Sequence, residues 1–318
     1  MDIVVVMDGP ETVDPDTDTS FALITAAQER DHRVWHCLPS DLSIVEGRVG
    51  ARATPAIADE TSTPPLLPMP GEDVDLAAVD AVLIRTDPPF DDTYLRLTLM
   101  LDPLTRTATS GEQTLVVNSP RGLRDANEKL YSLRFPEITP ETIVTADADR
   151  ITAFAMRHGG AVVKPIEGHG GRGVMAVRPD DHNAPSIIDT MTTRGRVPVV
   201  AQRFLDGVAA GDKRILLLDG EPLGAILRRP TDTDFRANIC VGGTVEVVEL
   251  DDDDHRIIET IAPSLHADGL HFVGIDVIDG LLSEVNVTSP TGLSQLTALG
   301  ADRPDLAVIR WLERTVAR

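Results

Sequence analysis

Short apolar runs alternate with polar, glycine-rich or proline-rich segments along the first third of the chain. The runs typical of buried strands, and the helical patterns between them, cover residues 2–7, 21–29, 34–38, 81–85, 92–105 and 115–118. This alternation predicts an α/β fold that begins with an open parallel sheet. A hairpin is expected over 45–53, and Ser20 is the expected cap of the first helix.

The pattern changes near Pro120, where strands begin to follow one another in hairpins. Predicted elements are helices over 122–130, 151–158, 255–267 and 304–316, and strands over 161–165, 174–177, 197–204, 215–218 and 223–227. The polar stretch 228–243 is too long for a turn and predicts a lid-like loop. We therefore expect three domains, an N-terminal α/β domain, a small central lobe and a C-terminal lobe, with boundaries 1–121, 122–200 and 201–318.

Residues 272–290 form the most informative stretch, with two apolar strands about a turn at Asp279-Gly280. In an antiparallel pair, the residue numbers of directly opposed residues add up to a constant sum. Side chains at every second position of a strand lie on the same face. A two-residue loop would put Asp276 and Glu284 on opposite faces. A three-residue loop over 279–281 would set them directly opposite each other, with Asn286 further along the same face.

Three oxygen-bearing side chains in a buried pattern predict a metal site at Asp276, Glu284 and Asn286. Hard oxygen donors suit Mg²⁺, which takes one or two carboxylates and fills its other positions with water and nucleotide phosphates. The alternative is a solvated hairpin whose acidic residues face water. The flanking isoleucine, valine and leucine residues favour the metal.

A glycine-rich segment joins the strands over 161–165 and 174–177. Glycines at 168, 170, 171 and 173 can bring backbone N–H groups around phosphate oxygens, and Lys164 lies at the end of the preceding strand. No Gly-Lys-Ser/Thr follows, so this is not a Walker loop. A mobile hairpin without a ligand is the alternative.

The composition excludes several classes of protein. The net charge of −22 argues against a nucleic-acid partner, and no apolar run reaches the length of a membrane span. The acidic start is unlike a signal peptide, and two isolated cysteines fit a reducing compartment, so we expect a cytoplasmic protein. Of the 29 basic residues only Lys129, Lys164 and Lys213 are lysines, the remaining 26 being arginines. Three retained lysines indicate positions where a compact ammonium meets phosphate.

Several motifs together resemble the bacterial glutathione synthetase family of ATP-grasp ligases. They are Asn127-Glu128-Lys129-Leu130, Val163-Lys164-Pro165, Gly211-Asp212-Lys213-Arg214, Arg236-Ala237-Asn238, Glu284-Val285-Asn286-Val287-Thr288-Ser289-Pro290 and Asp87-Pro88-Pro89-Phe90-Asp91. The resemblance implies a two-lobed ATP-grasp unit after the N-terminal sheet. It also implies ATP-dependent amide formation through an acyl phosphate, with ATP and Mg²⁺ as cofactors, two ions being expected and Mn²⁺ being an alternative.

The resemblance further implies roles for individual residues. Arg236 and Arg228 would stabilise the transferring phosphoryl group and the tetrahedral intermediate. Nucleotide contacts would come from Lys129, Lys164, Gly168, Gly170, Gly171, Gln202, Phe204, Leu205, Asp212 and Lys213. Substrate contacts would come from Ser20, Arg85, Asp87, Ser289 and Thr291. Family members are commonly oligomeric, so a homo-oligomer acting on small-molecule substrates is expected.

The chain departs from the family pattern where substrate or lid residues are expected. Cations typical of the family are replaced at Thr86, Thr244 and near Ser294, whereas the nucleotide and metal motifs are intact. The motifs thus support the ATP-dependent chemistry more strongly than the identity of the substrates. Glutathione synthesis from γ-glutamylcysteine and glycine is the leading hypothesis. The alternatives are a related ligase with another acyl donor or amine, and a nucleotide-binding regulatory protein without catalysis.

Overall fold

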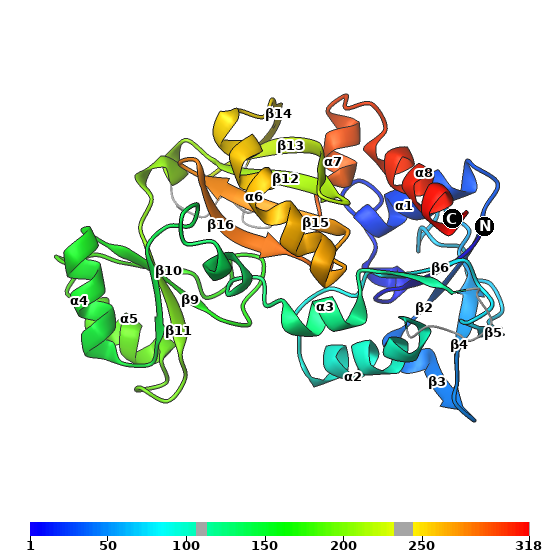
Figure 1. Ribbon diagram of the computed structural model, residues 1–318, viewed down its shortest axis with the longest axis horizontal. Helices are drawn as coiled ribbons and strands as arrows, with labels where there is room; N and C mark the ends of the chain where they lie inside the picture. The colour runs from blue at the N-terminus through cyan, green and yellow to red at the C-terminus, as the bar shows by residue number, and fades with distance from the viewer. Residues whose placement is uncertain (106–112, 232–243, 318) are drawn as a thin grey trace.

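The computed structural model describes residues 1–105, 113–231 and 244–317, which form three sheets arranged along the length of the molecule (Figure 1). The first sheet has the strand order β3-β4-β2-β1-β6-β7, with β5 paired to β4. Its strands are β1 (Asp2–Val6), β2 (Arg33–Cys37), β3 (Leu42–Val45), β4 (Arg48–Pro55), β5 (Glu72–Asp75), β6 (Ala81–Ile84) and β7 (Leu115–Val117).

The centre of this sheet is parallel, as predicted, because β1 pairs with β2 and β6, and β6 pairs with β7, in parallel register. An antiparallel extension, β4 with β3 and β5, adds to the β2 edge. The helices of this part are α1 (Thr19–Gln28), α2 (Asp92–Leu101) and α3 (Pro120–Asp125). The cap of α1 is Asp18, which accepts from the N–H groups of Ser20 and Phe21, so the expectation that Ser20 caps it was wrong.

The second sheet is four-stranded and antiparallel, with the order β10-β9-β11-β8. Two helices cover one of its faces (Figure 1). The elements are β8 (Thr142–Thr145), α4 (Ala148–His158), β9 (Ala161–Pro165), β10 (Met175–Val177), α5 (Ala184–Met191) and β11 (Val199–Arg203). Ile151, Phe154, Val163, Ile188 and Ala201 belong to a core cluster confined to this lobe.

The third sheet is five-stranded and antiparallel, with the order β14-β13-β12-β15-β16. Its strands are β12 (Asp212–Leu218), β13 (Glu221–Arg229), β14 (Thr244–Val248), β15 (Phe272–Ile278) and β16 (Leu281–Asn286). The helices that follow or flank it are α6 (Asp252–Asp268), α7 (Leu293–Ala298) and α8 (Pro304–Val316). Arg228 lies within β13 and not in the long connection where the sequence had placed it.

Two large apolar clusters join the first and third sheets. One contains Val4 and Val6 together with Ile215 and Ile275, and the other contains Ile3 together with residues of α1, α7 and α8. α8 packs beside α1, so the two chain ends lie close together (Figure 1). Among the described helices, none combines the length and hydropathy that a membrane span requires.

Candidate active site

The hairpin β15–β16 sets Asp276 directly opposite Glu284 and Gly274 opposite Asn286, as the sequence predicted. The predicted three-residue loop was wrong. The loop has two residues, Asp279 and Gly280, at φ values of 52° and 68°. A bulge between Asp276 and Val277 shifts the register by one residue, which restores the pairing that a two-residue loop alone would have broken.

Two guanidinium groups hold the Asp276 carboxylate. Arg214, opposite Asp276 on β12, donates from Nη2 to Oδ2 at 3.0 Å and also from Nε to Oδ1. Arg228 of β13 lies 2.9 Å from Oδ1. Burial alone would raise the pKa of Asp276, but the two arginines outweigh it and lower the pKa far below its usual range. The buried carboxylate is therefore ionised.

Asp212 shares Arg228 with Asp276. Arg228 Nη2 donates to Asp212 Oδ2 at 2.6 Å, while Asp212 Oδ1 is buried with no hydrogen-bond partner among the described residues. Burial raises the pKa of Asp212 to about 6, and the nearby carboxylates Asp276 and Glu284 act in the same direction. An unpartnered carboxylate oxygen in this position can accept a hydrogen bond from a ligand hydroxyl.

Glu284 connects the hairpin to the central lobe. Lys164 Nζ, at the end of β9, lies 3.2 Å from Glu284 Oε1 and 3.2 Å from Gln202 Oε1. Burial opposes ionisation of Glu284, but attraction to Lys164 and Lys129 is larger and lowers its pKa. Lys129 Nζ donates to the carbonyl oxygen of Gly168 in the glycine-rich loop. Both lysines therefore lie where β9, the loop and the hairpin meet.

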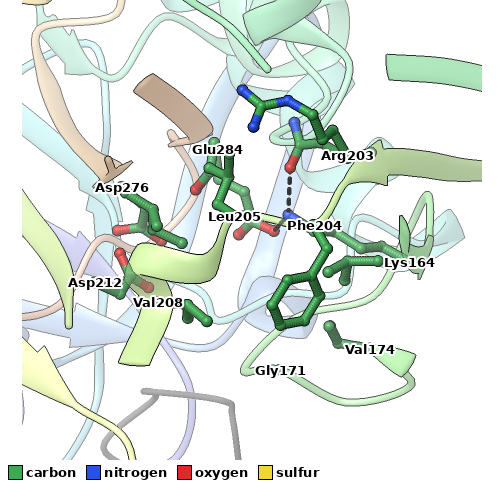
Figure 2. A pocket seen from close by; sticks show the side chains of 14 residues that line it. Lys164, Gly171, Val174, Arg203, Phe204, Leu205, Val208, Asp212, Asp276 and Glu284 are labelled. Atoms are coloured by element: carbon green, nitrogen blue, oxygen red, sulfur yellow. Dashed lines mark hydrogen bonds and ion pairs between the residues drawn. The ribbon is translucent and has the colours of Figure 1, made fainter. Parts of the chain in front are cut away.

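A pocket lies between the second and third sheets, and its two ends differ in character (Figure 2). The carboxylates Asp212, Asp276 and Glu284 are on one side, and Phe204 and Val174 are on the other, as Figure 2 shows. The apolar lining consists of Val162, Val174, Phe204, Leu205, Val208 and Ile278, and Gly171, Gln202 and Lys164 also line the pocket. A pocket with one apolar end and one charged end is suited to a nucleotide, whose base would lie at the apolar end and whose phosphates would lie at the charged end.

The glycine-rich loop has the backbone freedom expected of a phosphate-binding segment. Gly170, Gly171 and Gly173 have φ values of 57°, 71° and 71°, which residues with a Cβ rarely adopt. A Cβ on Gly168 would lie 2.9 Å from Pro165 and 3.2 Å from the carbonyl oxygen of Arg172. Substituting these glycines would therefore change the path of the loop.

Lys213 is not brought together with the other predicted nucleotide residues. It projects from the opposite face of β12, where Nζ lies 2.8 Å from Asp251 Oδ2 and also contacts Asp254. Asp254 is fully buried and, with Asp251, forms the capping box of α6. Asp251 is exposed and Asp254 is buried, so Lys213 joins the exposed start of α6 to its buried first turn.

We expect Lys213→Met to lower the free energy of unfolding by about 2 kcal/mol, because it leaves Asp254 without its cation. The KM for ATP should stay within about threefold of the wild-type value, since the side chain does not reach the pocket. Urea unfolding and steady-state kinetics measure the two effects separately. A large rise in this KM with unchanged stability would instead support a nucleotide contact.

A second pocket gathers all five predicted substrate residues, Ser20, Arg85, Asp87, Ser289 and Thr291. Arg85 is 5% exposed and donates from Nε to Ser20 Oγ at 3.2 Å and from Nη2 to the Pro290 carbonyl oxygen at 3.1 Å. Its Nη1 has no partner among the described residues. A buried guanidinium with a free donor is suited to a carboxylate ligand.

Residues that depart from the family pattern have ordinary structural roles in the described chain. Thr86 is buried, with Oγ1 3.4 Å from the carbonyl oxygen of Val6, and Ser294 Oγ donates to the carbonyl oxygen of Asp18 at 3.0 Å. Thr244 is the first residue of β14. Arg236, predicted to be catalytic, lies outside the described residues.

Two site residues had no role in the sequence-based prediction. Arg214 lies two residues after Asp212 on β12, so strand parity alone would have placed it on the same face as Asp212, and the pairing of β12 with β15 sets it opposite Asp276. Glu128 accepts a hydrogen bond from Thr288 Oγ1 at 2.8 Å and lies next to Lys129 in the motif already noted. The only sequence feature that could have indicated a role for Glu128 is its place in the Asn127-Glu128-Lys129-Leu130 motif.

The two antiparallel lobes with the pocket between them have the ATP-grasp fold. Solved structures with the same fold include D-cycloserine synthetase DcsG, with a TM-score of 0.67, 16% identity and coverage of 99% of this chain and 100% of that chain. The ATP-grasp ligase PsnB, solved with its minimal precursor, Mg and ADP, has a TM-score of 0.65 and 19% identity, covering 99% of this chain and 97% of its own.

The chain belongs to the prokaryotic glutathione synthetase family. The family's N-terminal domain matches residues 1–124 and its ATP-grasp domain matches residues 128–301. Glutathione synthetase of Thermosynechococcus vestitus is 44% identical over 98% of this chain and 99% of its own length. The Rhodopseudomonas palustris enzyme is 41% identical over 97% and 96%. The chain is thus an ATP-dependent amide ligase, as the sequence predicted.

Proposed function

We propose that this enzyme makes glutathione by joining γ-glutamylcysteine to glycine at the expense of ATP. Relatives named glutathione synthetase match at 40–44% identity over nearly the full chain. The observation that carries the proposal is the convergence of Lys164, Glu284 and Asp276 on one pocket. Binding of a nucleotide for regulation alone would not require this set of ion-paired groups.

We propose the following division of labour in the nucleotide pocket. Lys129, Lys164 and the loop glycines Gly168, Gly170 and Gly171 bind the phosphates, and Gln202, Phe204 and Leu205 bind the base. Asp212, with its unpartnered Oδ1, accepts from a ribose hydroxyl. Lys213 acts structurally, through Asp251 and Asp254.

The residues around the hairpin fit a divalent cation that arrives with the nucleotide. No group of three or more His, Cys, Asp and Glu side chains is arranged to hold a metal in the described chain. Two carboxylates, Asp276 and Glu284, with Asn286 beside them, match the usual protein share of a Mg²⁺ site, the rest being phosphate and water. Mg²⁺ bound there would neutralise phosphate charge; Mn²⁺ has the same ligand preference.

We expect the metal to bind weakly to the free enzyme, because Arg214, Arg228 and Lys164 already neutralise the carboxylates. With a non-hydrolysable ATP analogue present, the added phosphate charge should favour Mg²⁺ binding by tenfold or more, on the order of 1.4 kcal/mol. Isothermal titration calorimetry with and without the analogue checks this. Equal affinity in both states would contradict it.

The chain's own residues account for the two steps that follow. The donor carboxylate takes the terminal phosphoryl group of ATP while Lys129 and Lys164 hold its oxygens, giving an acyl phosphate and ADP. The neutral amine then attacks the acyl carbon, and the C–N bond forms to give a tetrahedral intermediate. The C–O bond to phosphate breaks, phosphate leaves with that electron pair, and the nitrogen loses its extra proton to solvent. Arg228, and Arg236 as the sequence predicted, stabilise the negative charge of this intermediate.

The direct test measures ADP formation with γ-glutamylcysteine and glycine, each omitted in turn, with the product identified by mass spectrometry. Turnover that needs both substrates and yields glutathione supports the proposal. No turnover with this pair removes it, and a screen of other donors and amines then tests the related-ligase alternative. ATP binding without turnover for any pair would favour the regulatory alternative.

We also propose that the three sheets correspond to domains with boundaries 1–121, 122–200 and 201–318. The first and third sheets lie within the first and last of these ranges, but residue 200 falls inside β11 (Val199–Arg203) of the second sheet, so the central domain has to extend to at least Arg203. A cytoplasmic location and a homo-oligomeric state remain predictions from the sequence. Size-exclusion chromatography with light scattering measures the subunit number.

A further inference from the structure

The segment that connects β11 to β12, residues 204–211, carries much of the apolar end of the nucleotide pocket. Phe204, Leu205 and Val208 of this connector all line the pocket, and Figure 2 shows the Phe204 ring on the side away from the carboxylates. Since these residues lie outside both sheets, contacts other than strand pairing must fix the position of their side chains. The contacts of Phe204 therefore bear on the shape of the pocket.

Arg178, which directly follows β10, packs against the ring of Phe204. Its Cζ atom lies 3.7 Å from the ring centroid, which makes this the closest contact between an arginine and an aromatic ring in the described chain. At that separation the guanidinium is in van der Waals contact with the ring. Arg178 itself does not line the pocket, so any effect on the pocket wall passes through Phe204.

The backbone beside Arg178 leaves room for this contact. Gly160 directly precedes β9, and its carbonyl oxygen accepts from the Phe204 N–H group at 3.2 Å. A Cβ on Gly160 would lie 3.1 Å from both Cδ and Nη1 of Arg178. The missing side chain at Gly160 therefore gives the arginine its path from the end of β10 to the ring.

The ion pair of Arg178 is a weaker interaction than its contact with the ring. Nη2 lies 3.8 Å from Asp206 Oδ1, and the Asp206 side chain is 92% exposed. Exposed ion pairs contribute little because water and salt screen them. The contact with the Phe204 ring is therefore the interaction through which Arg178 can affect the connector most.

We propose that Arg178 is a positioning residue that holds the Phe204 ring as a preformed wall for the nucleotide base. The inference rests on the proposed nucleotide pocket and extends it to a residue outside the pocket lining. A ring that is already fixed loses less conformational freedom when the base binds. Removal of the guanidinium should therefore weaken nucleotide binding although no contact with the nucleotide is lost.

The test measures the dissociation constant of ADP by isothermal titration calorimetry in the presence of Mg²⁺. Arg178→Leu should weaken ADP binding by about three- to tenfold, in line with the usual strength of a cation–π contact. Arg150→Leu is the matched control. Arg150 lies in the same lobe and has an ion pair of similar length, 3.7 Å to Asp147, but it contacts no aromatic ring among the described residues. This control should bind ADP with wild-type affinity.

A double-variant cycle with Phe204→Leu separates positioning of the ring from attraction between the Arg178 charge and the phosphates. If Arg178 acts through the ring, Arg178→Leu should change the ADP affinity of Phe204→Leu by less than about twofold. The full three- to tenfold loss in that background would overturn the inference, and so would an unchanged affinity in Arg178→Leu alone. If Arg178→Leu does not fold, Arg178→Lys replaces it in the cycle with the same expected direction, because lysine keeps the charge but not the flat guanidinium.

These outcomes are separate from the test of glutathione synthesis. A protein that shows the expected ADP affinities but does not turn over γ-glutamylcysteine and glycine would refute the proposed function and leave the role of Arg178 standing. A wild-type protein that does not bind ADP would refute both.

Discussion

Glu284→Ala is expected to lower kcat by about 10³-fold or more while the fold stays intact. Glu284 is the only described residue that contacts Lys164 from the hairpin, and it faces Asp276 in the proposed metal site. Its loss removes a carboxylate where phosphate charge has to be neutralised. Lys164 keeps its contact with Gln202, so the structural cost should be modest. Steady-state kinetics and circular dichroism measure the two effects.

Glu221→Ala is the matched control for this substitution. Glu221 is an exposed glutamate at the start of β13 and does not line the pocket. The Glu221→Ala variant should retain the wild-type kcat. Activity retained in Glu284→Ala would contradict the proposed role of the hairpin in catalysis, and so would a loss of equal size in both variants.

Arg228→Leu should cause the largest loss of stability, about 3–5 kcal/mol in the free energy of unfolding. Arg228 is buried and ion-paired with both Asp212 and Asp276. Its removal leaves Asp276 with Arg214 and leaves Asp212 with no ion-pair partner among the described residues. Burial lowers the pKa of Arg228, but the two carboxylates outweigh this and raise it well above its usual range, so the group is fully charged in the fold. Urea unfolding provides the measurement.

Arg229→Leu is the neighbouring control on the same strand. The Arg229 side chain is 48% exposed and pairs with Glu246, which is also exposed, so its loss should cost about 1 kcal/mol or less. Adding Asp212→Asn to Arg228→Leu should recover part of the lost stability, because one of the uncompensated charges is removed. Equal losses in Arg228→Leu and Arg229→Leu would refute the buried-network interpretation.

The sequence predicted most elements because their hydrophobic periods are clear. The parallel centre of the first sheet and the opposition of Asp276 to Glu284 both follow from pattern and parity. The bulge after Asp276 could not be predicted, because a two-residue turn with a bulge and a three-residue turn produce the same alignment of carboxylates. The predicted pairing of Asp276 with Glu284 was therefore correct although the predicted loop length was wrong.

The arginine network was beyond prediction for a different reason. Arg228 follows a run of apolar residues and precedes a polar stretch, so pattern alone ends the strand before it. Only the partners Asp212 and Asp276, from two other strands, make its burial possible. The second pocket likewise joins Ser20, Arg85 and Ser289 from distant segments. Family likeness, and not local pattern, had grouped these residues.

The core cluster confined to the β8–β11 sheet has a consequence for how the molecule moves. The other two sheets share apolar clusters and should lose their amide protection together on global unfolding. The central lobe has its own core with Ile151, Phe154 and Ile188, so we expect it to unfold separately and at a lower free energy. Lys164 and the glycine-rich loop belong to this lobe and are proposed to bind the nucleotide phosphates. Nucleotide binding should therefore slow amide hydrogen exchange more strongly in this lobe than in the other two sheets.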